Sequence, residues 1–212
     1  MWSNWARELG VRLEGSVRRP VAPDVFAAIG FDPSSGRFAA RGPLAIGTMA
    51  EIASTLATVL RRWCPSVAAA RRAVEEAWFV PDPNTLAMPL TDLPALFTHI
   101  RGTGRRIAVV TTDDRTATDA TLRHLGVRTF VDAMVCGDDG FAIKPAPDAI
   151  FALCQALQTT PARVAVIGDS PADMAMGRAA GAGLVIGVRT GIGCDADLDD
   201  ADVIVESVAA LI

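Results

Sequence analysis

Five polar residues of this sequence have the types and spacing that bind a phosphate group and a hard cation. Thr111 and Thr112 follow the apolar run IAVV, Lys144 precedes a proline-rich turn, and Asp169 and Asp173 follow the apolar run VAVIG. Lysine supplies a point charge for a phosphoryl group, and Mg²⁺ prefers carboxylate and phosphate oxygens. The sequence therefore predicts phosphate binding by Thr111, Thr112 and Lys144. It predicts Mg²⁺ binding by Asp169 and Asp173.

These residues lie at the ends of predicted strands in the second part of the chain. From about residue 90 onward, short apolar runs alternate with helical patterns, as in RIAVVTT, RTATDATLRHLGV and AMVCGDD. Strands that are apolar throughout and are each followed by a helix indicate a parallel sheet covered on both faces. The carboxyl ends of parallel strands meet at one edge of the sheet. We therefore expect the five residues to converge there.

The first part of the chain has a different pattern. Residues 1–89 contain only helical periodicities, in WARELGVRL, TMAEIASTLATVLRRW and SVAAARRAVEEAWF, with the loop FDPSSGRFAARGP between them. The stretch VPDPNTLAMP, residues 80–89, is typical of a linker. The sequence therefore predicts a helical domain over residues 1–89 and an α/β domain over residues 90–212.

Each candidate residue also has a purely structural interpretation. Asp169 would then cap the helix that follows it, because aspartate is a favoured N-cap residue. Lys144 would be a solvated loop residue, and Thr111 and Thr112 would be ordinary β-branched strand residues. These interpretations stay open for each residue taken alone, but the ordered combination of the three segments favours the phosphate and Mg²⁺ sites.

The order of the three segments resembles the haloacid dehalogenase (HAD) superfamily of hydrolases. VVTT with Thr111 is similar to its second motif, IKPAPD with Lys144 to its third, and VIGDSPAD with Asp169 and Asp173 to its fourth. The resemblance implies an α/β fold with a HAD-like Rossmannoid parallel sheet, helices on both faces and a helical cap, here residues 1–89. It implies catalytic roles for Thr111 and Lys144, which would bind the phosphoryl group and stabilise its developing charge. Asp169 would ligate Mg²⁺, and Asp173 would hold the metal site and Lys144.

From this resemblance we expect a Mg²⁺-dependent phosphatase of a small phosphorylated metabolite, working through an aspartyl-phosphate intermediate. The alternatives are a non-catalytic HAD-like binding or structural protein, a haloalkanoate dehalogenase and a phosphomutase. Dehalogenation needs no Mg²⁺, so the pair of acids counts against it. A receiver domain of a phosphorelay also uses Asp, Thr and Lys around Mg²⁺, but its acids come early in the chain, whereas here they come last.

The first motif of the family is missing from this sequence. In the family an apolar strand ends in Asp-x-Asp-Gly-Thr, which supplies the nucleophile and the general acid/base, and no acid before residue 105 has this context. Asp113 follows a strand, but that strand already carries the second motif. The missing strand would lie at the centre of the sheet, so its two neighbours would have unpaired edges. The helical pattern from Trp2 onward predicts that Met1 is internal to a longer protein and that the chain as given is inactive. A naturally shortened relative is the alternative.

Composition argues against other classes of function. The formal net charge is −4 with acids and bases interspersed, which counts against a nucleic-acid partner. No apolar run approaches the roughly 18 residues of a membrane span, and the N-terminus lacks an apolar signal core. We expect a cytoplasmic protein whose partner is a small phosphorylated molecule. Its widely spaced cysteines are expected to be reduced: Cys64, Cys136, Cys154 and Cys194. Assembly into a homo-oligomer stays open.

Overall fold

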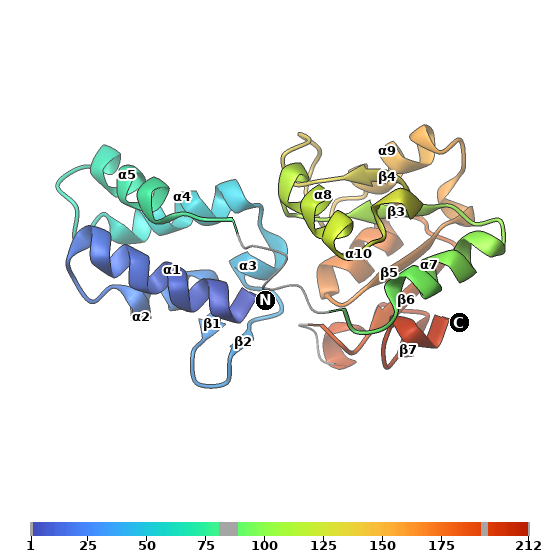
Figure 1. Ribbon diagram of the computed structural model, residues 1–212, viewed down its shortest axis with the longest axis horizontal. Coiled ribbons are helices and arrows are strands. Elements are labelled where there is room, and N and C mark those ends of the chain that lie inside the picture. Colours follow the sequence, from blue (N-terminus) through green and yellow to red (C-terminus); the bar gives the residue numbers. More distant parts are fainter. Residues whose placement is uncertain (1, 81–88, 192–194, 212) are drawn as a thin grey trace. The chain divides into compact units, whose positions relative to one another are not determined.

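The chain divides into two compact units, residues 1–82 and residues 83–212, here called unit 1 and unit 2 (Figure 1). The computed structural model describes residues 2–80, 89–191 and 195–211. Most of the predicted linker therefore lies outside the described residues, as do Met1 and Cys194. Among the helices described, none is long and apolar enough to cross a membrane.

Unit 1 is built from helices that share one apolar core. Leu9 and Leu13 of the first helix, Leu56 of the fourth and Val74 of the fifth are all buried in it. Their spacing places one apolar stripe on each helix, which explains the helical periodicity of the sequence. The helices are α1 (Trp2–Val17), α2 (Ala22–Ile29), α3 (Pro43–Ile46), α4 (Met49–Leu60) and α5 (Val67–Ala77).

The prediction that this region contains only helices is wrong at the loop between α2 and α3. Two short strands, β1 (Phe31–Asp32) and β2 (Arg37–Phe38), pair there in antiparallel register. The side chain of Asp32 accepts hydrogen bonds from the backbone N–H and the hydroxyl of Ser34, and Gly36 has a φ of 71°. The turn chemistry of aspartate and glycine therefore closes a hairpin that is too short to give a periodic sequence signal.

Unit 2 has the predicted α/β fold with parallel strands. β3 pairs in parallel with β4, and β6 pairs in parallel with both β5 and β7. The strands are β3 (Ile107–Val110), β4 (Val131–Val135), β5 (Ala165–Gly168), β6 (Leu184–Val188) and β7 (Val203–Val205). The helices are α7 (Leu93–Gly102), α8 (Arg115–His124), α9 (Asp148–Ala156) and α10 (Pro171–Ala180), with 3₁₀ turns at Arg128–Phe130, Pro161–Arg163, Asp195–Asp197 and Val208–Leu211.

Helices α9 and α10 join the two groups of strands. α9 packs against β3 and β4, α10 packs against β5 and β6, and the two helices contact each other. One apolar cluster consequently includes Val135 of β4, Ile150 of α9, Val166 of β5 and Met176 of α10. α7 packs against β3. The carboxyl ends of β3, β4 and β5 are thus held together by a shared core.

The strands nevertheless form two sheets rather than one. Among the described residues, β3 is hydrogen-bonded only to β4, and β5 only to β6. In Figure 1 the strands follow one another in the order β4, β3, β5, β6, β7, so the two unpaired edges belong to consecutive strands of this order. Ile167 of β5 is apolar and yet 42% exposed. No strand of the described chain occupies the position between β3 and β5, which we call the central slot.

Candidate phosphate and metal site

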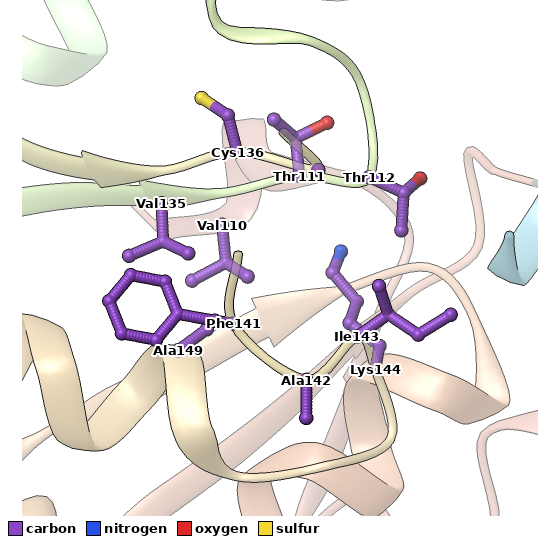
Figure 2. A pocket seen from close by; sticks show the side chains of 11 residues that line it. Val110, Thr111, Thr112, Val135, Cys136, Phe141, Ala142, Ile143, Lys144 and Ala149 are labelled. Carbon is purple, nitrogen blue, oxygen red and sulfur yellow. The ribbon is translucent and has the colours of Figure 1, made fainter. Parts of the chain in front are cut away.

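The threonines and the lysine predicted to bind phosphate line one pocket of unit 2. The pocket is small and open to solvent, and its lining includes Thr111, Thr112 and Lys144. It is lined by the end of β3, the end of β4 with the two residues that follow it, the loop over residues 141–144 and the start of α9. Figure 2 shows the Lys144 ammonium group directed toward the end of β3, where both threonines lie. The structure therefore brings these three residues together.

Lys144 is held inside this pocket by an ion pair. It is the only lysine among the 20 basic residues of the chain. Its Nζ lies 2.8 Å from Oδ1 of Asp173, and the side chains of Lys144 and Asp173 are only 16% and 9% exposed. A partly buried ion pair is less screened by solvent than a surface pair. The ion pair therefore restricts the ammonium group to one position in the lining of the pocket.

The second oxygen of Asp173 is also engaged. Its Oδ2 accepts hydrogen bonds from the backbone N–H of Ser170 at 3.2 Å and from the Ser170 hydroxyl at 2.6 Å. The Ser170 hydroxyl in turn accepts from the backbone N–H of Asp173, which completes a capping box at the start of α10. A Cβ added at Gly168 would lie 2.3 Å from the Asp173 Cβ. Asp173 therefore positions Lys144 and begins α10, and its role as a metal ligand stays a prediction.

Asp169 lies directly after β5, at the edge where the other strands end. A Cβ added at Gly191 would lie 1.7 Å from the Asp169 Oδ2, so the backbone of the loop after β6 packs directly on this carboxylate. No cluster of three or more His, Cys, Asp or Glu residues suited to a metal occurs in the described part of the chain. Mg²⁺ commonly uses one or two carboxylates and takes its remaining ligands from phosphate and water. Asp169 as the single carboxylate ligand fits Mg²⁺ on those terms, because both oxygens of Asp173 are engaged by Lys144 and Ser170.

The loop after β3 is fixed by backbone contacts. The backbone N–H of Thr111 donates to the carbonyl of Val135 at 3.0 Å, and the Thr111 hydroxyl oxygen accepts from the N–H of Asp113 at 3.1 Å. The N–H of Gly137 donates to the Asp113 carbonyl at 2.9 Å, and a Cβ at Gly137 would lie 2.1 Å from the Thr112 carbonyl oxygen. Position 137 therefore accepts only glycine, because any side chain there would overlap the Thr112 backbone. The hydroxyl of Thr111 thus accepts within the loop and has its proton available for an anion.

Sequence reasoning missed a cluster that joins the ends of β3 and β4. The Asp138 carboxylate accepts from the backbone N–H of Arg115 at 2.8 Å and so caps α8. The Arg115 guanidinium pairs with Asp139, whose carboxylate also accepts from the N–H of Cys136 at 2.7 Å. The hydrogen bonds with Arg115 lower the pKa of Asp139. The signal in the sequence was an Asp-Asp pair after a strand, which periodicity does not detect.

Asp113 has an unusual environment for a carboxyl group. Burial raises the pKa of Asp113 to about 6, and the positive charge of Lys144 offsets part of that increase. In the part of the chain that the structure describes, its carboxylate accepts no hydrogen bond. A carboxyl group removed from water without a partner favours its neutral form. The sequence left this residue without a role.

Comparison with protein families gives a match over most of the chain. The sequence profile of the haloacid dehalogenase-like hydrolases matches residues 38–181 of the 212. The matched residues extend from unit 1 through Lys144 to the end of α10, and they include all five candidate residues.

Curated relatives match over shorter segments. The chain is 34% identical over 115 residues to a phosphoglycolate phosphatase of Cupriavidus necator, which covers 53% of this chain and 49% of the relative. It is 37% identical over 79 residues to the fructose-1-phosphate phosphatase YqaB of Escherichia coli, which covers 37% of this chain and 42% of the relative. The matched segments thus span about half the length of these relatives, or less.

Solved structures match over nearly the whole chain at low identity. A predicted phosphoglycolate phosphatase from Haemophilus somnus superposes with a TM-score of 0.68 and 16% identity, covering 98% of this chain and 90% of that one. CbbY from Rhodobacter sphaeroides, solved in complex with phosphate, gives a TM-score of 0.59 and 22% identity, with coverage of 93% and 90%. At these identities the likeness shows the fold.

Proposed function

The chain belongs to the haloacid dehalogenase-like hydrolases, and we propose that it binds a small phosphorylated metabolite as part of a phosphatase. The observation that carries the proposal is the position of Lys144. The only lysine of the chain is largely buried, is held by Asp173, and shares a pocket with Thr111 and Thr112. A fixed ammonium group beside two hydroxyl groups is suited to the oxygens of a phosphoryl group.

The curated relatives support a phosphomonoester as the substrate class. Their names specify phosphoglycolate and fructose 1-phosphate as substrates, which share a phosphoryl group on a primary hydroxyl and differ in the rest of the molecule. The part of the site that unit 2 provides would therefore bind the shared phosphoryl group.

Mg²⁺ would be held by Asp169, with oxygens of the substrate phosphate and water as further ligands. When bound, it supplies positive charge that stabilises the transferred phosphoryl group. Asp173 would act on this site through Lys144, because both of its oxygens are already engaged. Thr111 and Lys144 would then orient the phosphoryl group and stabilise its developing charge.

The group that attacks phosphorus would come from the central slot. The family resemblance implies an aspartate at the end of a central strand, and in the described chain no strand lies between β3 and β5. We therefore propose that these residues bind phosphate and Mg²⁺ but do not turn a substrate over by themselves. The split sheet equally favours the second candidate, a non-catalytic HAD-like binding protein.

The test uses the single lysine as a reporter. An amine-directed acetylating reagent can modify only Lys144 and the N-terminal α-amine, and peptide mass spectrometry gives both rates in one sample. We expect inorganic phosphate with Mg²⁺ to slow acetylation of Lys144 at least fivefold while leaving the α-amine unaffected. Thr111→Val should abolish most of this protection, whereas Thr159→Val, outside the pocket, should retain it.

Two measurements test the proposal. Equal acetylation rates with and without phosphate would disprove the anion site. If protection occurs, hydrolysis of an aryl phosphate is measured with this chain. No turnover agrees with the proposed division of the site, whereas Mg²⁺-dependent turnover that is lost in Asp169→Asn would show that the described acids suffice.

A further inference from the structure

Unit 1 has a basic end that the proposed function does not use. The loop between α1 and α2 and the loop between α4 and α5 lie at the same end of this unit (Figure 1). An ion pair connects them, because Nη1 of Arg62 lies 3.7 Å from Oδ1 of Asp24 at the start of α2. We call residues 14–24 and 58–72 the basic end. Its arginines are all exposed: Arg18, Arg19, Arg61, Arg62, Arg71 and Arg72.

The acids of the basic end do not balance its positive charge. Its six arginines and two acids give a formal charge of +4, although the whole chain has a formal net charge of −4. Asp24 faces Arg62, and Glu14 accepts a hydrogen bond from the backbone N–H of Ala22 at 3.0 Å. Within the described part of the chain, the other five arginine side chains make no hydrogen bond or ion pair. Charges further away than a Debye length, about 8 Å at physiological ionic strength, are largely screened from this end.

Arg18 lies at a position where a side chain destabilises the loop. It follows the last residue of α1 with a φ of 53°, which is in the left-handed region. Glycine is the usual residue after a helix in this conformation, because it has no Cβ to clash with its own backbone. Residues held in such conformations cluster at functional sites. The strain therefore points to a role for the Arg18 guanidinium group.

The apolar and aromatic side chains of the basic end favour a lipid surface over a nucleic acid. Val67, which begins α5 between Arg62 and Arg71 in the chain, is 51% exposed. An exposed apolar side chain gains free energy at the boundary between lipid headgroups and acyl chains, and little from a phosphodiester backbone. The Arg62 guanidinium lies over the Trp63 ring at 4.6 Å, and Trp63 also packs on the core of unit 1. That ring is therefore poorly placed to stack on a nucleic-acid base.

We propose that the basic end of unit 1 binds the surface of an anionic lipid bilayer. Its arginines would contact the phosphates of the headgroups, and Val67 would reach the boundary with the acyl chains. Basic side chains near an anionic membrane each add to the affinity, so binding weakens with every arginine removed and with added salt. The inference does not depend on the phosphate site of unit 2.

The experiment measures cosedimentation of the full chain with vesicles of phosphatidylcholine that contain about 30% phosphatidylglycerol, and with vesicles of phosphatidylcholine alone. We expect binding to the anionic vesicles only, and its loss as the NaCl concentration rises from about 0.05 M to about 0.5 M. Arg19→Gln with Arg61→Gln removes one charge from each loop without removing a contact. The partition coefficient of this double variant should fall at least tenfold.

A second double variant provides the matched control. Arg37→Gln with Arg41→Gln removes the same charge from exposed positions that follow the other end of α2. Its partition coefficient should stay within about twofold of wild type, because these arginines lie outside the basic end. Circular dichroism melts verify that each variant is folded.

Arg18→Gly distinguishes a role in binding from a role in the fold. Glycine adopts a φ of 53° without strain, so the melting temperature should stay the same or rise. Binding to the anionic vesicles should nevertheless fall about fivefold, because one charge is lost. Unchanged binding in this variant would overturn the role of Arg18.

Four further outcomes would overturn the proposal. The first is equal binding to the neutral and the anionic vesicles, or binding to neither. The second is an equal loss in the two double variants, which would assign binding to total charge. Binding of a single-stranded oligonucleotide without binding of the vesicles would assign the basic end to nucleic acid. Self-association that depends on salt and concentration, again without vesicle binding, would assign it to a second copy of the chain.

Discussion

Units 1 and 2 contain similar apolar residues but bury them to different extents. In unit 1, Leu9 of α1 and Leu56 of α4 are fully buried in one closed core. In unit 2, Ile167 of β5 and Leu184 of β6 are 42% and 37% exposed. Strand register places both on the face of their sheet opposite Val166 and Val185, which are buried.

The difference follows from how helices and strands satisfy their backbone. A helix pairs its N–H and C=O groups internally and needs other helices only to cover its apolar stripe. A strand in the interior of a sheet needs a neighbour on each edge to pair its N–H and C=O groups. Unit 1 can therefore satisfy its helical backbone and bury its apolar stripes with its own residues. In the described part of unit 2, β3 and β5 each have an unpaired edge, and Ile167 of β5 remains in contact with water.

The largest expected effect comes from truncating one leucine in each unit to alanine and comparing the losses in stability. Leu9→Ala removes a fully buried side chain and should lower the free energy of unfolding by about 2 to 5 kcal/mol, whereas Leu184→Ala should cost less than about 1 kcal/mol. All four tryptophans, at positions 2, 5, 63 and 78, belong to unit 1, so their fluorescence in urea follows that unit alone. Circular dichroism follows both units. Similar losses for the two variants would contradict the contrast in packing.

A second comparison concerns two acids whose pKa values move in opposite directions. Hydrogen bonds from Ser34 and Ser35 lower the pKa of Asp32 in unit 1 to about 2, and burial raises the pKa of Asp113 in unit 2 to about 6. Carboxyl carbon titration by NMR should give these two midpoints. If both carboxyl groups titrated near the ordinary pKa of aspartate, the predicted difference between Asp32 and Asp113 would be wrong.

The same shifts predict opposite effects on stability. The folded-state pKa of Asp113 lies above its unfolded value, so ionisation destabilises the fold as the pH rises from about 4 to about 6. Asp113→Asn should therefore be more stable than wild type by about 1 to 3 kcal/mol above pH 6 and no different below about pH 4. For Asp32 the folded-state pKa is lowered, so its contribution is present above about pH 4 and is lost as the pH falls toward 2.

The smallest expected effect compares the two capping boxes. In unit 1, Thr48 and Glu51 cap α4 reciprocally, and in unit 2, Ser170 and Asp173 cap α10 in the same way. Thr48→Ala and Ser170→Ala should each cost about 1 kcal/mol in thermal or urea unfolding. Only Ser170→Ala should also weaken phosphate binding, because Asp173 holds Lys144 as well as the cap. Weaker binding in Thr48→Ala would contradict this assignment.

Local sequence signals were sufficient for most helices and strands. Apolar runs gave the parallel strands and helical spacing gave α1, α4 and α5, whereas the roles of Thr111, Lys144 and Asp169 stay predictions. The hairpin over residues 31–38 was missed because two-residue strands have no periodicity. The contacts of Asp113 and Arg115 were missed because each is made with a loop that is distant in the sequence.

The sequence by itself determined the order of strands and helices, the absence of an Asp-x-Asp motif after an apolar strand, and the residue types available to bind phosphate and Mg²⁺. These are properties of neighbouring residues, which periodicity and motif spacing report directly. Only the tertiary structure decided that Oδ1 of Asp173 binds Lys144 and that its Oδ2 accepts hydrogen bonds from Ser170 in the helix cap. It also decided that the Asp113 carboxylate accepts no hydrogen bond within the described part of the chain and that burial raises its pKa. Burial and charge at one point depend on segments that only folding brings together, so the sequence alone does not distinguish one carboxylate from another.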